Sequence, residues 1–415
     1  MRTMNLLYNI FLYSLWFLST YYVVVLVLIM LVGRKNLYEN RKFDFKKEPR
    51  VSVIIPAYNE QGKIKFTIKS LRKVNYKNIE FIIVNDGSKD KTSKEVKENI
   101  KGDPRFLFID RKENRGKAAS LNEGIARASG EFVATMDADS VIEPGIFYKT
   151  VPYFSDEKIA AVTVSVLVKD PKSFIHKIFE MEYIIGLSLY LKVFSFFNGI
   201  FVTPGPFSIY RKSIIQNIGG FDEKNITEDM EIAYRIQKNH YKIVNCLEAK
   251  AYTILPPTFR KITVQRRRWY SGALHTLSKH RNVLANKKYG AFGFVAFLNY
   301  LLIFLGLLLF LSTIYLFGSN LLKDLLHLQY SNLDLWLRLK SMEFDILTMS
   351  RAAVLGFVSI SFTVFGLIVG LIMTRTDVRN KKLGILGYPF LFFLYQYFWL
   401  VSIINVIGGK GIKWR

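Results

Sequence analysis

Residues 79–88, IEFIIVNDGS, are an apolar run that stops at a cluster of polar, turn-forming residues. This pattern is typical of a buried strand followed by a turn. Similar runs predict strands at 51–56, 105–109 and 131–136, separated by helical patterns at 63–73, 91–100 and 117–128. Gly130 is expected to stop the last of these helices. Alternating strands and helices predict an α/β domain with a mostly parallel sheet and helices on both faces.

Polar side chains follow three of the predicted strands. They are Tyr58 and Glu60 after Pro56, Asp86 and Gly87 after residue 84, and Asp137 and Asp139 after residue 136. Ligands of parallel sheets bind beyond the carboxyl ends of the strands. The sequence therefore predicts a functional site at this edge of the sheet.

The composition is that of an apolar yet basic chain. Half of the 415 residues are apolar, and 58 Lys and Arg face 33 Asp and Glu, for a net charge of +25. So much apolar surface excludes a disordered chain, and the single cysteine, Cys246, excludes an intramolecular disulfide framework. The basic surplus suggests a membrane protein whose soluble part faces anionic lipid or phosphate. A positive-inside excess is the alternative source of the charge.

Four apolar runs are long enough to cross about 30 Å of hydrocarbon. They cover residues 6–32, 292–317, 352–374 and 385–407. The first is too long for a signal peptide and is followed directly by Arg34 and Lys35 rather than by a cleavage site. We therefore expect a membrane helix in 1–35, a soluble domain in 48–275, and about three spans after a short interface segment in 276–415.

Basic residues near the ends of the first three spans predict which side of the membrane the domain occupies. They are Arg34, Lys35, Arg41, Lys42, Lys46, Lys47, Lys287, Lys288, Arg375, Arg379, Lys381 and Lys382. With four spans they share one side, which predicts a multi-pass protein of the cell membrane with a cytoplasmic domain. Residues 318–350 would then lie outside, as would the tail residues Lys410, Lys413 and Arg415, against the rule. Either the last run does not fully cross, or the bias is overridden there.

Residues 173–197 are mostly apolar but carry charges such as Lys177, Glu180 and Glu182. These charges argue against a fifth span and favour an amphipathic helix in the membrane interface. A helix buried in the soluble domain is the alternative.

Two pairs of acidic residues suggest chemistry. Asp137 and Asp139 are two residues apart at a strand end, so their carboxylates point the same way. Two such carboxylates suit Mg²⁺ or Mn²⁺ shared with substrate phosphates. A solvated turn is the alternative. Glu228 and Asp229 follow Thr227, which is expected to cap a helix, and the two acids favour the first turn. An acid held at a helix start is also a rigidly placed base.

Three further features have both a functional and an ordinary interpretation. Lys117 at a helix start opposes the helix dipole, which a bound anion would explain; a solvated lysine is the alternative. Asp86 could accept hydrogen bonds from a base or ribose, or simply form an Asp-Gly turn. Arg268 beside Trp269 offers a phosphate clamp next to a stacking surface, or a basic stretch snorkelling near the membrane.

Several motifs in order resemble one family. They are Asp86-Gly87, Asn114-Arg115-Gly116-Lys117, Asp137-Ala138-Asp139, Gly205-Pro206-Phe207, Thr227-Glu228-Asp229 and Gln265-x-x-Arg268-Trp269. Over about residues 50–275 the chain resembles the processive, membrane-embedded family 2 glycosyltransferases, which include cellulose, chitin, hyaluronan and poly-N-acetylglucosamine synthases. Val164 and Ser165 depart from a Gly-Asn pair that several relatives carry near the donor sugar, so the resemblance does not fix the donor.

The resemblance implies a type A glycosyltransferase domain that transfers sugar with inversion from a nucleotide-diphosphate sugar, such as a UDP-sugar, to a growing β-linked polysaccharide, coupled to translocation. Asp229 would be the catalytic base, and Asp139 with Asp137 would hold Mg²⁺ or Mn²⁺. The substrate-binding residues would be Asp86 at the nucleobase, Asp137 at the ribose, Lys117 and Arg268 at the diphosphate, Gln265 and Trp269 at the acceptor, and Pro56, Tyr58, Glu60 and Glu228. The implied partners are the donor, a polysaccharide or glycolipid acceptor and the bilayer, with no nucleic acid; export partners are not identified.

Two other functions compete. A single-transfer enzyme could glycosylate ceramide or a polyprenyl phosphate, although polyprenyl-phosphate enzymes of this fold usually lack Gln-x-x-Arg-Trp. A non-enzymatic membrane protein could use its basic face to bind lipid, but the acidic motifs would then be superfluous.

Overall fold

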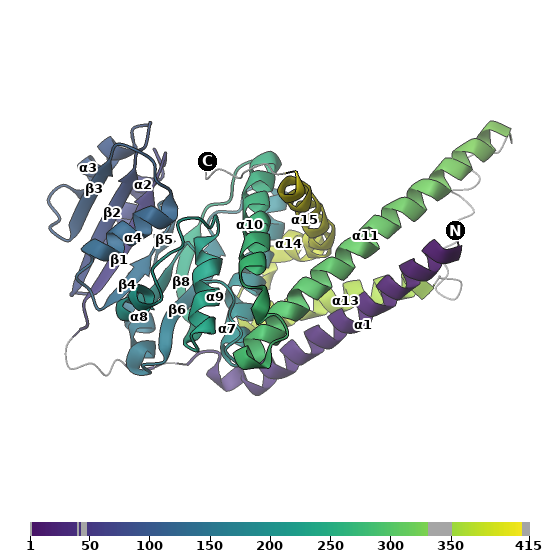
Figure 1. Cartoon of the computed structure of the whole chain (residues 1–415), viewed down its shortest axis with the longest axis horizontal. Coiled ribbons are helices and arrows are strands. Elements are labelled where there is room, and N and C mark those ends of the chain that lie inside the picture. Colours follow the sequence, from purple (N-terminus) through teal and green to yellow (C-terminus); the bar gives the residue numbers. More distant parts are fainter. Residues whose placement is uncertain (1, 40, 43–47, 331–350, 409–415) are drawn as a thin grey trace.

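The computed structural model describes residues 2–39, 41–42, 48–330 and 351–408. The basic residues Lys46 and Lys47, the tail residues Lys410, Lys413 and Arg415, and most of the segment predicted to lie outside the membrane fall beyond this description. Within it, an α/β domain adjoins a group of long apolar helices (Figure 1).

One eight-stranded sheet forms the centre of the domain, in the order β3-β2-β1-β4-β7-β6-β8-β5. Its parallel half is β1 (Val51–Ala57), β2 (Ile79–Asp86), β3 (Phe106–Arg111) and β4 (Phe132–Thr135). In the other half β7 (Ser208–Arg211) is antiparallel to β4 and β6, β6 (Ile159–Val168) is parallel to β8 (Lys242–Thr253), and β5 (Val141–Ile142) is antiparallel to β8. The predicted parallel order therefore holds up to β4, where β7 interrupts it.

Helices cover both faces of the sheet. Among them are α2 (Ile64–Arg72), α3 (Thr92–Ile100), α4 (Lys117–Arg127), α5 (Ile146–Thr150), α8 (Lys212–Asn217) and α9 (Glu228–Lys238). Helix α10 (Phe259–Lys279) packs on α9 rather than on the sheet. Strand β1 is buried along its whole length because Ile54 packs in the same core as α4, while Val53 and Ile55 pack in the core that includes α2. Double-sided burial explains why the strands read as continuous apolar runs.

The sequence predicts that Gly130 stops the helix that begins at Lys117, but this helix ends before the glycine is reached. Helix α4 ends at Arg127, and Gly130 keeps an ordinary backbone. Its backbone N–H donates to Ser52 Oγ at 2.8 Å, and a Cβ at this position would lie 2.7 Å from the Ser52 nitrogen. The glycine is needed for close approach to β1.

Four helical segments are long and apolar enough to cross a membrane: Leu6–Asn36, Lys287–Asn320, Ala353–Met373 and Val378–Ile407. They correspond to α1 (Arg2–Val32), α11 (Gly290–Tyr330), α13 (Arg351–Met373), and α14 (Lys382–Gly387) with α15 (Leu391–Ile407). In Figure 1, α1, α11 and α13 run together away from the domain, whereas α15 lies beside α10. Large apolar side chains such as Phe17, Phe304 and Phe357 are exposed on the first three, as expected for surfaces facing lipid.

The segment predicted as an interface helix consists of α6 (Phe174–Ile184), a π-helical stretch (Ile185–Tyr190) and α7 (Leu191–Ser195). It packs against β6 on one side and against α14 on the other, and most of its side chains are buried. Two of its charges form ion pairs, Glu180 with Lys381 and Glu182 with Arg266. The segment is therefore packed between the sheet and α14, and its place in the membrane interface stays a prediction.

Candidate active site

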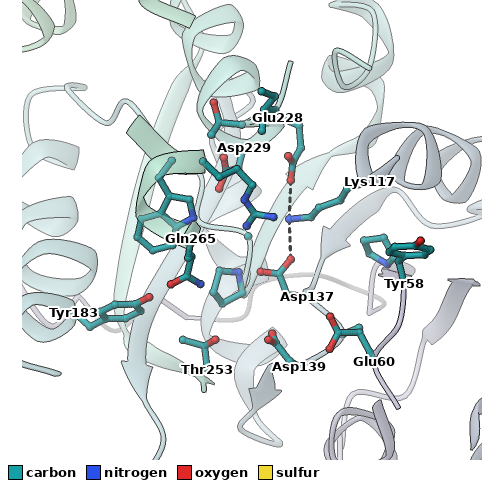
Figure 2. Close-up of a pocket in the computed structure, with 18 residues that line it drawn as sticks. Tyr58, Glu60, Lys117, Asp137, Asp139, Tyr183, Glu228, Asp229, Thr253 and Gln265 are labelled. Carbon is teal, nitrogen blue, oxygen red and sulfur yellow. Dashed lines mark ion pairs between the residues drawn. The ribbon is translucent and has the colours of Figure 1, made fainter. Parts of the chain in front are cut away.

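A pocket at the carboxyl edge of β1 and β4 gathers most of the predicted site residues (Figure 2). The loops after these strands contribute Tyr58, Glu60, Asp137 and Asp139, while the helix starts of α4 and α9 contribute Lys117, Glu228 and Asp229. Its lining residues are Pro56, Tyr58, Glu60, Lys117, Asp137, Ala138, Asp139, Tyr183, Gly205, Pro206, Ile226, Thr227, Glu228, Asp229, Thr253, Gln265, Arg268 and Trp269. Chain segments far apart in sequence therefore share one cavity.

Lys117 lies at the centre of the charged part of the pocket. Its Nζ is 2.7 Å from Asp137 Oδ1 and 2.6 Å from Glu228 Oε1, as drawn in Figure 2. Burial by itself lowers the pKa of Lys117, but the carboxylates of Asp137 and Glu228 outweigh it and raise that pKa overall. The side chain is only 13% exposed, which excludes the alternative of a solvated lysine.

Asp229 is held in a fixed position at the start of α9. Its Oδ1 accepts from the Met230 backbone N–H at 2.9 Å, and its carbonyl oxygen accepts from the Thr203 N–H and hydroxyl. Burial and, after it, the nearby Glu228 carboxylate raise the pKa of Asp229 to about 7. A carboxyl that titrates near neutral pH can exist as a base and accept a proton from a bound hydroxyl.

Thr227 occupies the expected N-cap position, but its side chain makes no capping bond. Its hydroxyl donates instead to Asn225 Oδ1 at 3.2 Å. A Cβ on Gly272 of α10 would lie 2.3 Å from Thr227 Cγ2. The glycine thus lets α10 pack closely on the start of α9, where Asp229 is held.

Asp137 and Asp139 provide carboxylate oxygens to the same pocket. Asp139 lies 3.8 Å from Lys63 Nζ, and that ammonium also binds Glu60 at 2.9 Å. Among the described residues, no group of three His, Cys, Asp or Glu side chains gathers to hold a metal by itself. Two carboxylates fit Mg²⁺ or Mn²⁺ when phosphates and water supply the other ligands.

Gly205 is a site residue whose role the sequence reasoning missed. A Cβ there would lie 2.8 Å from Asp137 Oδ2 and 2.9 Å from Lys117 Nζ. The Gly205 carbonyl also accepts from the Asp137 backbone N–H at 3.1 Å. The absence of a side chain at Gly205 lets this loop approach the Lys117–Asp137 ion pair. In the sequence, the Gly205-Pro206 pair was the only local sign of this role. Tyr183 and Thr253 were missed as well, and nothing in their local sequence marks them.

Asp86 does not line the pocket. It is 1% exposed, and its carboxylate accepts from the backbone N–H groups of Arg115 at 2.9 Å and Gly116 at 2.8 Å, and from the Arg111 guanidinium at 3.0 Å. The loop that it binds leads directly into Lys117. In this structure Asp86 therefore fixes the loop that carries the lysine, and its predicted contact with a nucleobase stays a prediction.

Gln265, Arg268 and Trp269 line the pocket from one face of α10, as their spacing of three and four residues requires. The helix is capped by Thr258, whose hydroxyl accepts from the Lys261 N–H. Gln265 Oε1 is buried and has no hydrogen-bond partner within the described part of the chain. An acceptor of this kind, aimed at a pocket, suits a ligand that carries hydroxyl groups.

Comparisons with known proteins agree with this architecture. Residues 52–219 match the family described as Glycosyl transferase family 2. The chain is 28% identical over 418 residues to a poly-beta-1,6-N-acetyl-D-glucosamine synthase from Staphylococcus epidermidis, covering 98% of this chain and 95% of the relative. It is 30% identical over 268 residues to the Staphylococcus aureus (strain MSSA476) protein of the same name, covering 62% and 65% respectively. In structure it resembles the mannosyltransferase PcManGT from Pyrobaculum calidifontis, with a TM-score of 0.61, 16% identity, and coverage of 96% and 100%.

The fold is that of a type A glycosyltransferase joined to membrane helices, as predicted. More particularly, the chain is a membrane glycosyltransferase with a family 2 domain, homologous to the poly-beta-1,6-N-acetyl-D-glucosamine synthases. The family resemblance seen in its motifs is thereby confirmed.

Proposed function

We propose that this enzyme polymerises a β-linked polysaccharide, taking an N-acetylhexosamine from a UDP-sugar donor and adding it with inversion to the growing chain. The observation that carries the proposal is the meeting of Asp229, the Lys117–Asp137 pair and Trp269 in one pocket next to the membrane helices. The names of the staphylococcal relatives support the sugar and the product.

The donor diphosphate would lie between Lys117 and Arg268. Lys117 is already surrounded by carboxylates, and a phosphate would add to or replace these partners. Arg268 lines the same pocket from α10. Cationic groups fixed at the leaving diphosphate stabilise the charge that develops as the glycosidic bond breaks.

Asp137 and Asp139 would hold a divalent cation at the same diphosphate. When bound, that Mg²⁺ or Mn²⁺ supplies further neutralisation of the leaving group. The solved mannosyltransferase of the same fold was obtained with GDP-Man and Mn²⁺, which supports this role for the carboxylates.

Asp229 would take the proton from the acceptor hydroxyl as its oxygen attacks the anomeric carbon. Attack from the face opposite the diphosphate converts an α-linked donor into a β-linkage. General-base assistance of this kind contributes about 10²–10⁴-fold to the rate. The hydroxyl-bearing acceptor would stack on Trp269 and bond to the unpartnered oxygen of Gln265.

The membrane helices would carry the product across the bilayer while the domain stays in the cytoplasm. The contact of α10 with α15 supports this, because the helix that holds the acceptor residues packs on a candidate span. The basic residues near the span ends favour the cytoplasmic side for the domain.

The test is to incubate the purified protein in membranes with radiolabelled UDP-N-acetylglucosamine and to size the product. Labelled polymer is expected. A labelled glycolipid of one sugar would overturn processive synthesis, and failure with every UDP-sugar would overturn the proposed donor.

A further inference from the structure

We propose that Glu182, Arg266 and Tyr395 form a positioning network that holds Trp269 in the orientation needed for sugar transfer and links it to the membrane helix α15. The inference rests on the proposed role of Trp269 at the acceptor. It assigns a function to Arg266, the second residue of the Gln265–Trp269 motif, which is buried and does not line the pocket as Gln265, Arg268 and Trp269 do.

Arg266 is a cation buried at the centre of the junction between domain and membrane helices. It is 2% exposed, and both of its terminal nitrogens donate to Glu182, each at 2.7 Å. Its guanidinium lies 4.5 Å from the centre of the Trp269 ring and 4.6 Å from that of Phe179. The indole therefore has a charged, planar group over one face, and that group is fixed by a two-point bond.

Glu182 connects three helices through its carboxylate. Besides Arg266 of α10, it accepts from the Tyr395 hydroxyl of α15 at 2.6 Å, and it belongs to α6 itself. The next residue, Tyr183, lines the pocket. A displacement of α15 along its axis would thus act on the same carboxylate that orients Arg266 beneath Trp269.

Stability alone is a weak reason for such a network. Removing two charges from water costs much of what their attraction returns, so apolar side chains of similar size often stabilise a protein as well or better. A bidentate pair has a fixed direction that apolar packing lacks. Orientation of the neighbouring indole is a function that uses this direction.

The matched control lies on the same helix. Glu180 is 7% exposed and forms an ion pair with Lys381 at 2.5 Å, but it does not line the pocket. Glu180→Gln therefore breaks a comparably buried pair of α6 without releasing Arg266. Any effect that Glu182→Gln shares with this control is a general effect on folding.

The experiment compares Glu182→Gln, Tyr395→Phe and Glu180→Gln as folded, full-length protein in membranes. Polymer formation and hydrolysis of UDP-N-acetylglucosamine by water are measured side by side, with the KM for the donor. Glu182→Gln is expected to lower polymer formation by about threefold to tenfold, which is at most the loss expected when stacking on Trp269 is removed altogether. Donor hydrolysis and its KM should change little, and Glu180→Gln should leave the ratio of the two reactions unaltered.

Tyr395→Phe keeps the Glu182–Arg266 ion pair and removes one hydroxyl, so it can be tested even if Glu182→Gln fails to fold. It should shift the ratio of polymer formation to donor hydrolysis in the same direction. Equal loss of both reactions in Glu182→Gln, or an unchanged ratio in Tyr395→Phe, would overturn the positioning role. Trp269→Ala separates this from the proposed function. If Trp269→Ala alters the ratio of polymer formation to donor hydrolysis and the network variants do not, only the positioning role of the network fails. If Trp269→Ala leaves this ratio unchanged, the acceptor role of Trp269 fails.

Discussion

At the scale of single residues, the site depends on a small number of charged contacts. Lys117 is shared between Asp137 and Glu228, and Asp229 lies in the same pocket in a partly buried position that disfavours its ionised form. Each of these groups changes the charge felt by the others, so isosteric substitutions are the most informative.

Asp229→Asn should lower sugar transfer by about 10²–10⁴-fold while donor affinity is preserved, because the amide cannot accept the proton. Since the pKa of Asp229 is raised to about 7, the wild-type rate should rise as pH increases through neutrality, where the carboxylate forms. The variant should lack this limb of the pH profile. Transfer rates and donor binding across pH 5–9 (roughly two units either side of that pKa) check both points. Collapse of donor affinity with turnover intact would make Asp229 a binding residue.

Asp139→Asn should reduce transfer by about a hundredfold or more without unfolding the protein, since a neutral amide is a poor ligand for a hard cation. A chelator should have the same effect on the wild type, reversed by added Mn²⁺ or Mg²⁺. Titration of activity with each metal is the measurement. Full activity in excess chelator would contradict the metal role.

Gly205→Ala should lower transfer by about tenfold to a hundredfold, because the new Cβ would separate Lys117 from Asp137. Gly145 offers a control, since a Cβ there meets nothing within 4 Å and its φ is −93°. Activity and thermal unfolding of both alanine variants are compared. Equal activity in the two would show that the loop adapts to a side chain.

At the scale of elements, α10 is the helix that joins the site to the membrane helices. One face carries Gln265, Arg268 and Trp269 into the pocket, while Arg266 is buried against α6 and α15. These contacts predict that α10 does more than a basic helix that only snorkels, and substitutions on it test this.

Trp269→Ala should lower polymer formation by about threefold to tenfold, since aromatic stacking contributes about 0.5–1.5 kcal/mol. Donor hydrolysis should be nearly unaffected.

Arg268→Ala should impair both reactions, because it removes a contact to the diphosphate. Arg260→Ala, at an exposed position on the same helix, is the control for a general loss of basic charge. If all three variants only reduce membrane insertion, α10 has a structural role alone.

At the scale of the whole molecule, the domain core and the membrane helices are continuous. Leu26 and Met30 of α1 and Leu371 of α13 belong to the same buried cluster as Ile54 and Leu121 of the domain. The domain is therefore packed against the membrane helices rather than connected to them by a flexible linker. The side of the membrane on which the domain lies is the side on which it uses the donor.

A cysteine introduced at the exposed position Lys101 tests that side. The native Cys246 is 3% exposed and should not react, so the wild type provides the background. Lys101→Cys should react with a membrane-impermeant maleimide only after the cells are opened. Labelling in intact cells would place the domain outside and contradict the proposed orientation.

Local sequence patterns were enough to predict the strands of the parallel half, the four apolar runs and most of the pocket residues. Periodicity, turn residues and the carboxyl ends of strands are local properties, so Asp137 and Asp139 could be found without a structure. Lys117 and Asp229 were found at predicted helix starts, and their roles were implied by the resemblance of their motifs to the family. The insertion of antiparallel β7 between β4 and β6 was beyond such reasoning, because strand order depends on long-range pairing.

The partners of the charged side chains, in contrast, are known from the three-dimensional structure alone. Lys117 meets Glu228 and Arg266 meets Glu182 across long stretches of chain, and no local pattern records such distances. Asp86 was recognised as an acid at a strand end, but its burial against the loop before Lys117 depends on how that loop folds back. Gly205 follows the same logic: a glycine's importance depends on what would meet its missing side chain, and that is set by the packing of the whole domain.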